Sequence, residues 1–200
     1  MVTTLPTLPP EARPARIRDD PTPGVGGRHV DGAAVLAALA DVPDPEIPAV
    51  SIVDLGMVGA VDVAETGIRV ELLPTFVGCP ALELIRASVA ERLAAFGRPV
   101  QVDVSFATPW TTDRISSEGR EKLRGSGFAP PPHLREGRAL PVLDRPAATA
   151  SSGIAEQDEV TCPYCGSTAT TLENLFGPTQ CRSIRHCSAC RQPFEAFKAV

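Results

Sequence analysis

Hydrophobic and polar residues alternate in three segments of the first half of the chain, and alternation of this kind predicts β-strands. Residues 59–63 and 68–72 are two such segments, and the turn at residues 65–67 between them predicts a hairpin. The third segment is 100–106, whose apolar positions are Val100, Val102, Val104 and Phe106. The pattern therefore predicts a small three-stranded β-sheet.

A longer segment repeats its apolar residues every three or four positions, which predicts a helix with one buried face. This helix is expected to run from Cys79 or Pro80 to Phe96. Its apolar stripe consists of Leu82, Ile85, Val89 and Leu93. Two shorter helices are expected over residues 32–40 and 118–124. The fold class predicted for this part is α+β, a small three-stranded sheet packed with helices.

The last forty residues carry two CxxC motifs that are separated by 21 residues. Their cysteines are Cys162, Cys165, Cys187 and Cys190. Two turns of this kind can face each other and complete a tetrahedral site of four thiolates. Zinc is the usual metal at such a site, an iron–sulfur cluster uses the same ligands, and disulfides or free thiols are the alternatives without a metal. The spacing favours a separate zinc-ribbon-like β module with four cysteine ligands.

The predicted ribbon contains few large apolar residues, so a bound metal would supply much of its stability. Strands are expected over residues 168–172 and 193–198, with Phe194 and Phe197 as apolar anchors. Gly166 follows the first CxxC motif, at a position where the backbone often needs a positive φ.

Proline and alanine content divides the chain into four parts. Residues 1–28 combine many prolines with mixed charges and predict a disordered N-terminal tail. The α+β domain covers residues 29–127. Residues 128–158 are rich in proline, alanine and serine and predict a linker, after which the metal ribbon covers residues 159–200.

Overall composition restricts the classes of partner. The formal net charge of −5 argues against a nucleic-acid-binding protein, as does the lack of a basic run with interleaved aromatic residues. The longest apolar run, residues 33–40, is too short to span a membrane, and the N-terminal segment lacks the apolar core of a signal peptide. We therefore expect a cytoplasmic protein that binds neither nucleic acid nor membrane and keeps its cysteines reduced.

Cys79 is the candidate functional residue of the first domain. It lies between Gly78 and Pro80 at the predicted start of the long helix. A helix N-terminus favours a thiolate, and a thiolate can ligate a metal or attack an electrophile. The structural alternative is a small buried cysteine.

Polar residues in neighbouring loops are candidates for contact with a cargo held by Cys79. These candidates are Asp44, Asp54, Thr111, Thr112 and Asp113. Each has a structural alternative, because side chains of these types commonly cap turns and helix starts. Trp110 is either a recognition residue or a lid over the core. Cys181 lies six residues before Cys187. As an accessory thiol it would lie beside the metal site or act as an alternative ligand. The structural alternative is a buried cysteine.

Four loop motifs of the first domain resemble the iron–sulfur cluster assembly (metal–sulfur cluster biosynthetic) domain family. They are Asp44-Pro-Glu-Ile-Pro48, Ser51-Ile-Val-Asp-Leu-Gly56, Pro74-Thr-Phe-Val-Gly-Cys-Pro80 and Thr108-Pro-Trp-Thr-Thr-Asp113. The CxxC motifs and the segment Phe176-Gly-Pro-Thr-Gln-Cys-Arg182 resemble one branch, the PaaD (PaaJ) family of proteins associated with phenylacetyl-CoA epoxidase. The resemblance covers about residues 30–130 and 160–198.

The resemblance implies an accessory protein of the multicomponent phenylacetyl-CoA ring epoxidase, in aerobic phenylacetate catabolism. It favours a maturation factor or accessory subunit over a catalyst in its own right and leaves enzyme activity open. The implied role is assembly of an iron–sulfur cluster, or its insertion into the reductase component, which carries flavin and an iron–sulfur centre. Cys79 would hold the transient cluster, and Asp54 lies in a motif shared with the family. The alternative is a non-catalytic structural or electron-transfer subunit of the oxygenase. The oligomeric state is open, with a homodimer as one candidate.

Overall fold

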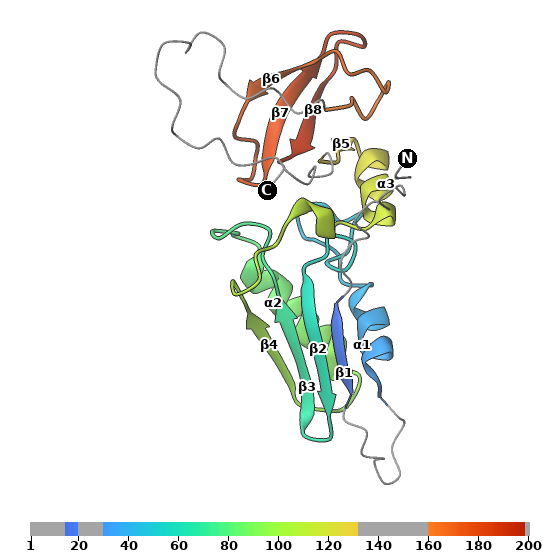
Figure 1. Ribbon diagram of the computed structural model, residues 1–200, viewed down its shortest axis with the longest axis vertical. Helices are drawn as coiled ribbons and strands as arrows, with labels where there is room; N and C mark the ends of the chain where they lie inside the picture. Colours follow the sequence, from blue (N-terminus) through green and yellow to red (C-terminus); the bar gives the residue numbers. More distant parts are fainter. Residues whose placement is uncertain (1–14, 20–29, 132–159, 199–200) are drawn as a thin grey trace, which may run out of the picture. The chain divides into compact units, whose positions relative to one another are not determined.

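The computed structural model describes residues 15–19, 30–131 and 160–198. The chain divides into two compact units, Met1–Leu123 and Arg124–Val200. Each unit is built on a β-sheet of its own (Figure 1).

The sheet of the first unit contains four strands in the order β1-β2-β3-β4. They are β1 (Arg16–Asp19), β2 (Val58–Ala64), β3 (Gly67–Leu72) and β4 (Val100–Val104). The predicted hairpin is formed by β2 and β3, while β1 runs parallel to β2 and β4 runs parallel to β3. Because Leu72 pairs with Val104, the chain leaves β3 and β4 at the same end of the sheet.

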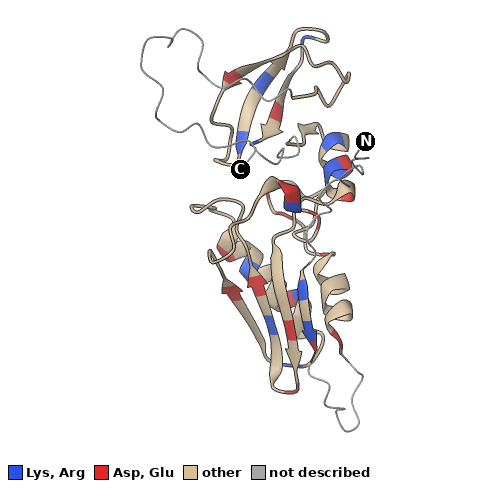
Figure 2. Cartoon of the chain, in the orientation of Figure 1, with Lys and Arg blue, Asp and Glu red and all other residues tan. Residues whose placement is uncertain are grey.

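Two helices, α1 (Gly32–Leu39) and α2 (Leu82–Ala94), cover one face of this sheet (Figure 1). Strand alternation turns apolar side chains toward the helices. The buried strand residues include Val61, Val63, Ile68, Val70 and Leu72. The other face carries charged residues (Figure 2), including the ion pair between Arg69 and Asp103 at 2.6 Å. The α+β prediction is confirmed. Among the described helices, none has the length and apolar character to cross a membrane.

The sheet of the first unit has one strand more than predicted. The extra strand, β1, lies within residues 1–28, which the sequence predicts to be disordered. Its only apolar residue is Ile17, so the segment has no alternating pattern to recognise; pairing with β2 and contact between Ile17 and Gly32 hold it in place. The rest of the predicted tail, up to residue 28, lies outside the described residues. At the other edge, β4 ends before Phe106, whose side chain is 55% exposed.

The sheet of the second unit, the ribbon, has the strand order β5-β8-β7-β6. Its strands are β5 (Phe128–Ala129), β6 (Thr170–Asn174), β7 (Arg182–Cys187) and β8 (Pro193–Phe197). The predicted strands correspond to β6 and β8, and Phe194 and Phe197 are buried as expected. The sequence does not predict β7, because two arginines interrupt its apolar pattern. Arg182 is nevertheless buried, with an ion pair to Glu195 at 2.9 Å.

Strand β5 belongs to the ribbon, although residues 128–158 are predicted to form a linker. It pairs in parallel with β8, and Ala129 is part of the apolar core of the ribbon. Helix α3 (Ser117–Gly125) ends only two residues before β5. Residues 132–159, which lie outside the described part, therefore connect β5 with the rest of the ribbon.

Candidate metal centre and cargo site

The four cysteines of the CxxC motifs come together in the ribbon. Their Sγ atoms all lie within 4.8 Å of one another, with 3.7 Å between Cys162 and Cys190 and 3.6 Å between Cys165 and Cys187. A metal with four tetrahedral bonds of about 2.3 Å to sulfur requires sulfur–sulfur distances of about 3.8 Å. Disulfides require about 2.05 Å, so the sulfurs are not paired covalently. The four thiol groups fit a single metal ion.

Both CxxC motifs are folded into the same kind of turn. In the first, the amide of Gly166 donates to the carbonyl of Cys162 at 3.0 Å, and in the second the amide of Arg191 donates to the carbonyl of Cys187 at 2.7 Å. The residue after the second cysteine has a positive φ in each case, 73° at Gly166 and 60° at Arg191. The expectation for Gly166 is confirmed, and Arg191 adopts the same conformation at the cost of a crowded Cβ.

Arg191→Gly is expected to stabilise the metal-loaded ribbon by about 1 kcal/mol, because glycine adopts a positive φ without steric cost. The measurement is competition with a chromogenic chelator, in which the variant should retain metal at higher chelator concentration. Ala189→Gly in the same turn is the control, because Ala189 has no positive φ to relieve. Equal or weaker metal retention by the Arg191 variant would contradict the prediction.

The electrostatics of the cluster oppose a state with four thiolates and no cation. Backbone amides of Cys190 and Ala189 lower the pKa of Cys187 to about 6, although burial opposes this shift. Burial and the neighbouring thiols raise the pKa of Cys190 to about 12. Sulfurs this close cannot all ionise unless a positive charge compensates them, which is what a divalent metal supplies.

Cys181 lies outside the group of four. Its Sγ lies 3.2 Å from the hydroxyl oxygen of Thr179, and its carbonyl accepts from the amide of Lys198 at 2.9 Å. The side chain is half-buried. The first contact lies within the turn before β7 and the second joins that turn to the residue after β8. An accessory role for Cys181 stays a prediction.

Cys79 lies in the loop between β3 and α2 and is half-buried. Its amide donates to the carbonyl of Phe76 at 3.2 Å, and its carbonyl accepts from the amide of Leu82 at 3.4 Å. The helix begins at Leu82 with Ala81 as its N-cap, so the predicted helix start at Cys79 or Pro80 is too early. The effect of the helix dipole falls off within about one turn. Cys79 therefore belongs to a turned loop in front of the helix.

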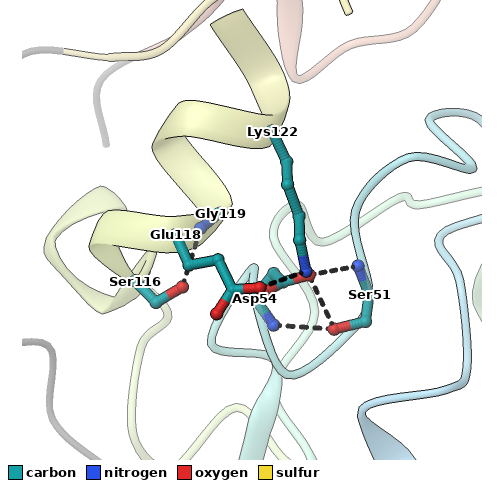
Figure 3. Close-up of polar contacts among 6 residues, drawn as sticks. All are labelled: Ser51, Asp54, Ser116, Glu118, Gly119 and Lys122. Carbon is teal, nitrogen blue, oxygen red and sulfur yellow. Dashed lines mark hydrogen bonds and ion pairs between the residues drawn. The ribbon is translucent and has the colours of Figure 1, made fainter. Parts of the chain in front are cut away.

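Asp54 makes the turn-capping bonds that the sequence offers as its structural alternative (Figure 3). Its Oδ2 accepts from the amide and the hydroxyl of Ser51, each at 2.9 Å, and forms an ion pair with Lys122 of α3 at 2.9 Å. Burial raises the pKa of Asp54. The hydrogen bonds from Lys122 and Ser51, together with the positive charge of Lys122, outweigh burial and leave the pKa below its usual value. Asp44 is also a turn cap, because its Oδ1 accepts from the amides of Glu46 and Ile47.

Asp54→Asn is expected to lower the free energy of unfolding of the first unit by about 1 to 3 kcal/mol at pH 7, since a buried hydrogen-bonded charge is lost. The folded-state pKa of Asp54 lies below the unfolded value of about 3.9. Its ionised form therefore stabilises the fold above that value, and the contribution is lost as the pH falls through the folded-state pKa. Urea unfolding can be followed by fluorescence of Trp110, the single tryptophan.

The matched control for this prediction is Asp103→Asn. Hydrogen bonds from Gln101 and Arg69 also lower the pKa of Asp103, but its side chain lies at the surface, where solvent screens such pairs. We expect a much smaller loss of stability from the control. Equal losses from both variants would contradict a special role for Asp54 in fixing α3.

The loop after β4 is fixed by buried groups. Trp110 is buried and donates from Nε1 to the carbonyl of Leu55 at 2.8 Å, so it takes the lid role. Thr112 is fully buried in the short 3-10 helix Thr112–Arg114, and its carbonyl accepts from Arg120 at 2.6 Å. Burial lowers the pKa of Arg120, and the charge of Asp113 partly opposes this shift. Thr111 precedes the 3-10 helix without a side-chain capping bond.

The sequence does not predict the contacts of the cationic side chains that hold this region together. Lys122 and Arg120 reach the loops from α3, and Arg114 donates to the carbonyls of Gly56 and Val58 at 2.8 and 3.1 Å. The only local signal is the spacing of Glu118 and Lys122, which form an i,i+4 ion pair at 2.9 Å. The structure thus gives Asp44 and Asp54 structural contacts, while contact of the predicted loop residues with a cargo stays a prediction.

Comparison with known proteins finds a match for each unit. A family model for iron–sulfur cluster assembly proteins matches residues 32–106, and a family model for the PaaD zinc beta ribbon domain matches residues 146–198. A protein from Escherichia coli (strain K12), named as a putative subunit of 1,2-phenylacetyl-CoA epoxidase, is 37% identical over 167 residues, which are 83% of this chain and 92% of that protein. The chain belongs to the PaaD family.

Two solved structures are similar to part of this PaaD-family chain. One is the domain of unknown function DUF59 from Bacillus anthracis, at 29% identity, covering 46% of this chain and 89% of that one with a TM-score of 0.43. The other is a conserved hypothetical protein from Thermotoga maritima, at 30% identity, covering 48% of this chain and 97% of that one with a TM-score of 0.43. The resemblance of the sequence to the PaaD family is confirmed by the family models and by the relative from Escherichia coli.

Proposed function

We propose that this protein is an accessory factor of phenylacetyl-CoA epoxidase that holds an iron–sulfur cluster on Cys79 and passes it to the reductase component. The observation that carries the proposal is the union, in one chain, of an iron–sulfur cluster assembly domain with the ribbon of the PaaD family. The relative from Escherichia coli, which is named a putative subunit of this epoxidase, supports the link with the oxygenase. The proposed site of action is the cytoplasm, where thiols remain reduced.

Cys79 is the proposed point of attachment because its loop is open to solvent. The residues beside it, Val77, Gly78 and Pro80, are all exposed, so a bulky inorganic group can approach the half-buried cysteine. One cysteine offers one bond to a cluster, and a group held so weakly is suited to transfer and not to storage. The proposed role of three residues is to fix the loops beside the cargo site: Asp54, Trp110 and Thr112. The proposal also includes direct contact between the cargo and Asp44, Thr111 or Asp113.

The metal of the ribbon is proposed to be Zn²⁺. Its four cysteines complete a tetrahedral site and leave no position for a substrate, which is the arrangement of structural zinc. Zinc would supply stability and no redox chemistry. The sulfur–sulfur distances of 3.6 and 3.7 Å support one ion bound by four terminal thiolates.

The second candidate function is a permanent, non-catalytic subunit of the oxygenase, with a structural or electron-transfer role. It is favoured by the name of the Escherichia coli relative, which describes a subunit and not an assembly factor. Electron transfer would require redox-active iron in the ribbon in place of zinc. A homodimer is compatible with either function.

Transfer to the reductase is the test that separates the two functions. The protein, purified without oxygen and loaded with a cluster, is mixed with iron-free reductase, and the reductase is then isolated and assayed for iron and for its cluster absorbance. Recovery of a loaded reductase from the wild-type protein, but not from Cys79→Ala, supports the delivery function. A protein that delivers no iron, and that co-purifies with the oxygenase in fixed stoichiometry, supports the permanent subunit.

A further inference from the structure

Large apolar side chains are exposed in the loop of Cys79 and in two neighbouring segments, the first turn of α2 and the loop after β4. Four large apolar side chains of the first unit are exposed there: Phe76 at 38%, Val77 at 81%, Leu84 at 57% and Phe106 at 55%. We call these four residues the apolar rim. Phe76 and Val77 lie in the loop that leads to Cys79, and Leu84 lies in the first turn of α2.

The topology of the sheet brings the two loops of the apolar rim together. The chain leaves β3 and β4 at the same end, because Leu72 pairs with Val104 and the amide of Ser105 donates to the carbonyl of Leu72 at 2.9 Å. The loop that follows β4 and contains Phe106 therefore starts beside the segment that continues from β3. Figure 1 shows both segments leaving the same end of the sheet. The rim is thus formed by residues far apart in the sequence.

The two loops that form most of the apolar rim contain no charged residue. None occurs in residues 73–82 or in residues 104–112, although 22% of the whole chain is charged. The open face of the same sheet, by contrast, carries Arg18, Asp62, Arg69 and Asp103 (Figure 2). Interface centres are depleted of charge and enriched in aromatic residues, and exposed apolar patches mark interaction sites.

We propose that the apolar rim is the surface on which the acceptor of the cluster docks, an acceptor that presents cysteine thiols within an uncharged apolar surface. The inference rests on the proposed function for the identity of this partner. Direct transfer requires the acceptor sulfurs to reach the iron held at Cys79, so the acceptor must contact the surface around that residue. The single bond from the Cys79 thiolate to iron is replaced by one from an acceptor thiolate; the acceptor thiol proton passes to Cys79, and no electron is transferred.

The size of the apolar rim favours a transient partner over a second copy of this chain. Its four side chains expose on the order of 400 Å². A stable complex of standard size buries about 800 Å² on each partner, whereas weak encounters bury less than about 600 Å² on each. A contact of this size can form and separate repeatedly, which delivery requires.

The experiment measures binding of the full chain to purified iron-free reductase and, in parallel, to each of the other epoxidase components. Val77→Ser and Phe106→Ser remove apolar surface without touching the buried core. Each variant is expected to weaken binding to the acceptor at least about tenfold, as loss of an interface anchor commonly does. Phe176→Ser is the matched control, because Phe176 is 63% exposed but lies in the ribbon, and it should bind as the wild type does.

Other outcomes would overturn the inference. Unchanged binding by both rim variants, or a loss with Phe176→Ser alone, would place docking elsewhere. Self-association of the wild-type protein in sedimentation, abolished by the rim variants, would identify a homodimer surface. Failure of the wild-type protein to bind any epoxidase component would overturn both the inference and the proposed function. If binding depends on the apolar rim but no iron passes to the bound component, the docking surface is supported and only the delivery function is refuted.

Discussion

Replacing Cys165 by serine is expected to unfold the ribbon and leave the first unit folded. Among the described residues, the apolar core cluster of the ribbon contains six buried residues, two of which, Cys162 and Cys187, belong to the proposed metal ligands. Metal binding contributes about 10 to 16 kcal/mol in small zinc modules, which is as much as the whole stability of a typical domain. Loss of one ligand therefore removes more stability than the other contacts of the ribbon supply.

This result can be checked unit by unit with NMR. The amide signals of β6, β7 and β8 should lose their dispersion in the Cys165 variant, and those of β5 should follow because β5 pairs only with β8 among the described strands. Fluorescence of the buried Trp110 should remain native, since it reports on the first unit. Cys181→Ser is the control and should keep both metal and dispersion. A dispersed ribbon spectrum from metal-free Cys165→Ser protein would refute the role of the metal.

Cys79→Ala is expected to abolish support of phenylacetate ring oxygenation while the protein remains folded. The half-buried side chain lies in an exposed loop outside the apolar cores, so its truncation leaves only a small cavity, if any. The sulfur is the proposed attachment point of the cargo, and alanine offers no ligand in its place. Growth on phenylacetate of a strain that lacks this protein should be restored by the wild-type gene and not by the variant.

The iron content of the reductase, measured in the same strains, gives the reason for any loss of growth. An iron-poor reductase in the Cys79→Ala strain agrees with delivery. A fully loaded reductase in a strain that does not grow would favour the permanent subunit, and full growth would show that Cys79 is packing. Cys181→Ala serves as the control for loss of a thiol, and its melting curve should match that of the wild-type protein.

The sequence predicts those elements whose signal is local and repeated. The hairpin of β2 and β3 and the long helix α2 each repeat their apolar period several times, and the paired CxxC motifs specify a metal site by spacing alone. Strands β1 and β5 contain four and two residues, which is too few for any period. Strand β7 contains two buried arginines, and only the three-dimensional contact of Arg182 with Glu195 explains the burial of the first of them.

The candidate site was predictable in its residue types and less so in its contacts. Asp54 is recognisable as a turn cap from its local sequence, but its partner Lys122 is 68 residues away and carries no sign of the pairing. The sequence places Cys79 at the start of the long helix, whereas α2 begins only at Leu82 because Pro80 and Ala81 remain in the turn before the helix. The apolar rim is likewise hidden, since the alternating pattern assigns Phe106 to the buried face.

The pairing of β5 with β8 has a consequence for the order in which the protein forms during synthesis. All described elements of the first unit precede β5, so this unit can complete its core while the ribosome is still translating the ribbon. Strand β5 must wait for β8, which follows both CxxC motifs. A nascent chain halted before residue 187 would carry only two of the four ligands, so the ribbon can acquire its full set of metal ligands only after Cys190 has been translated.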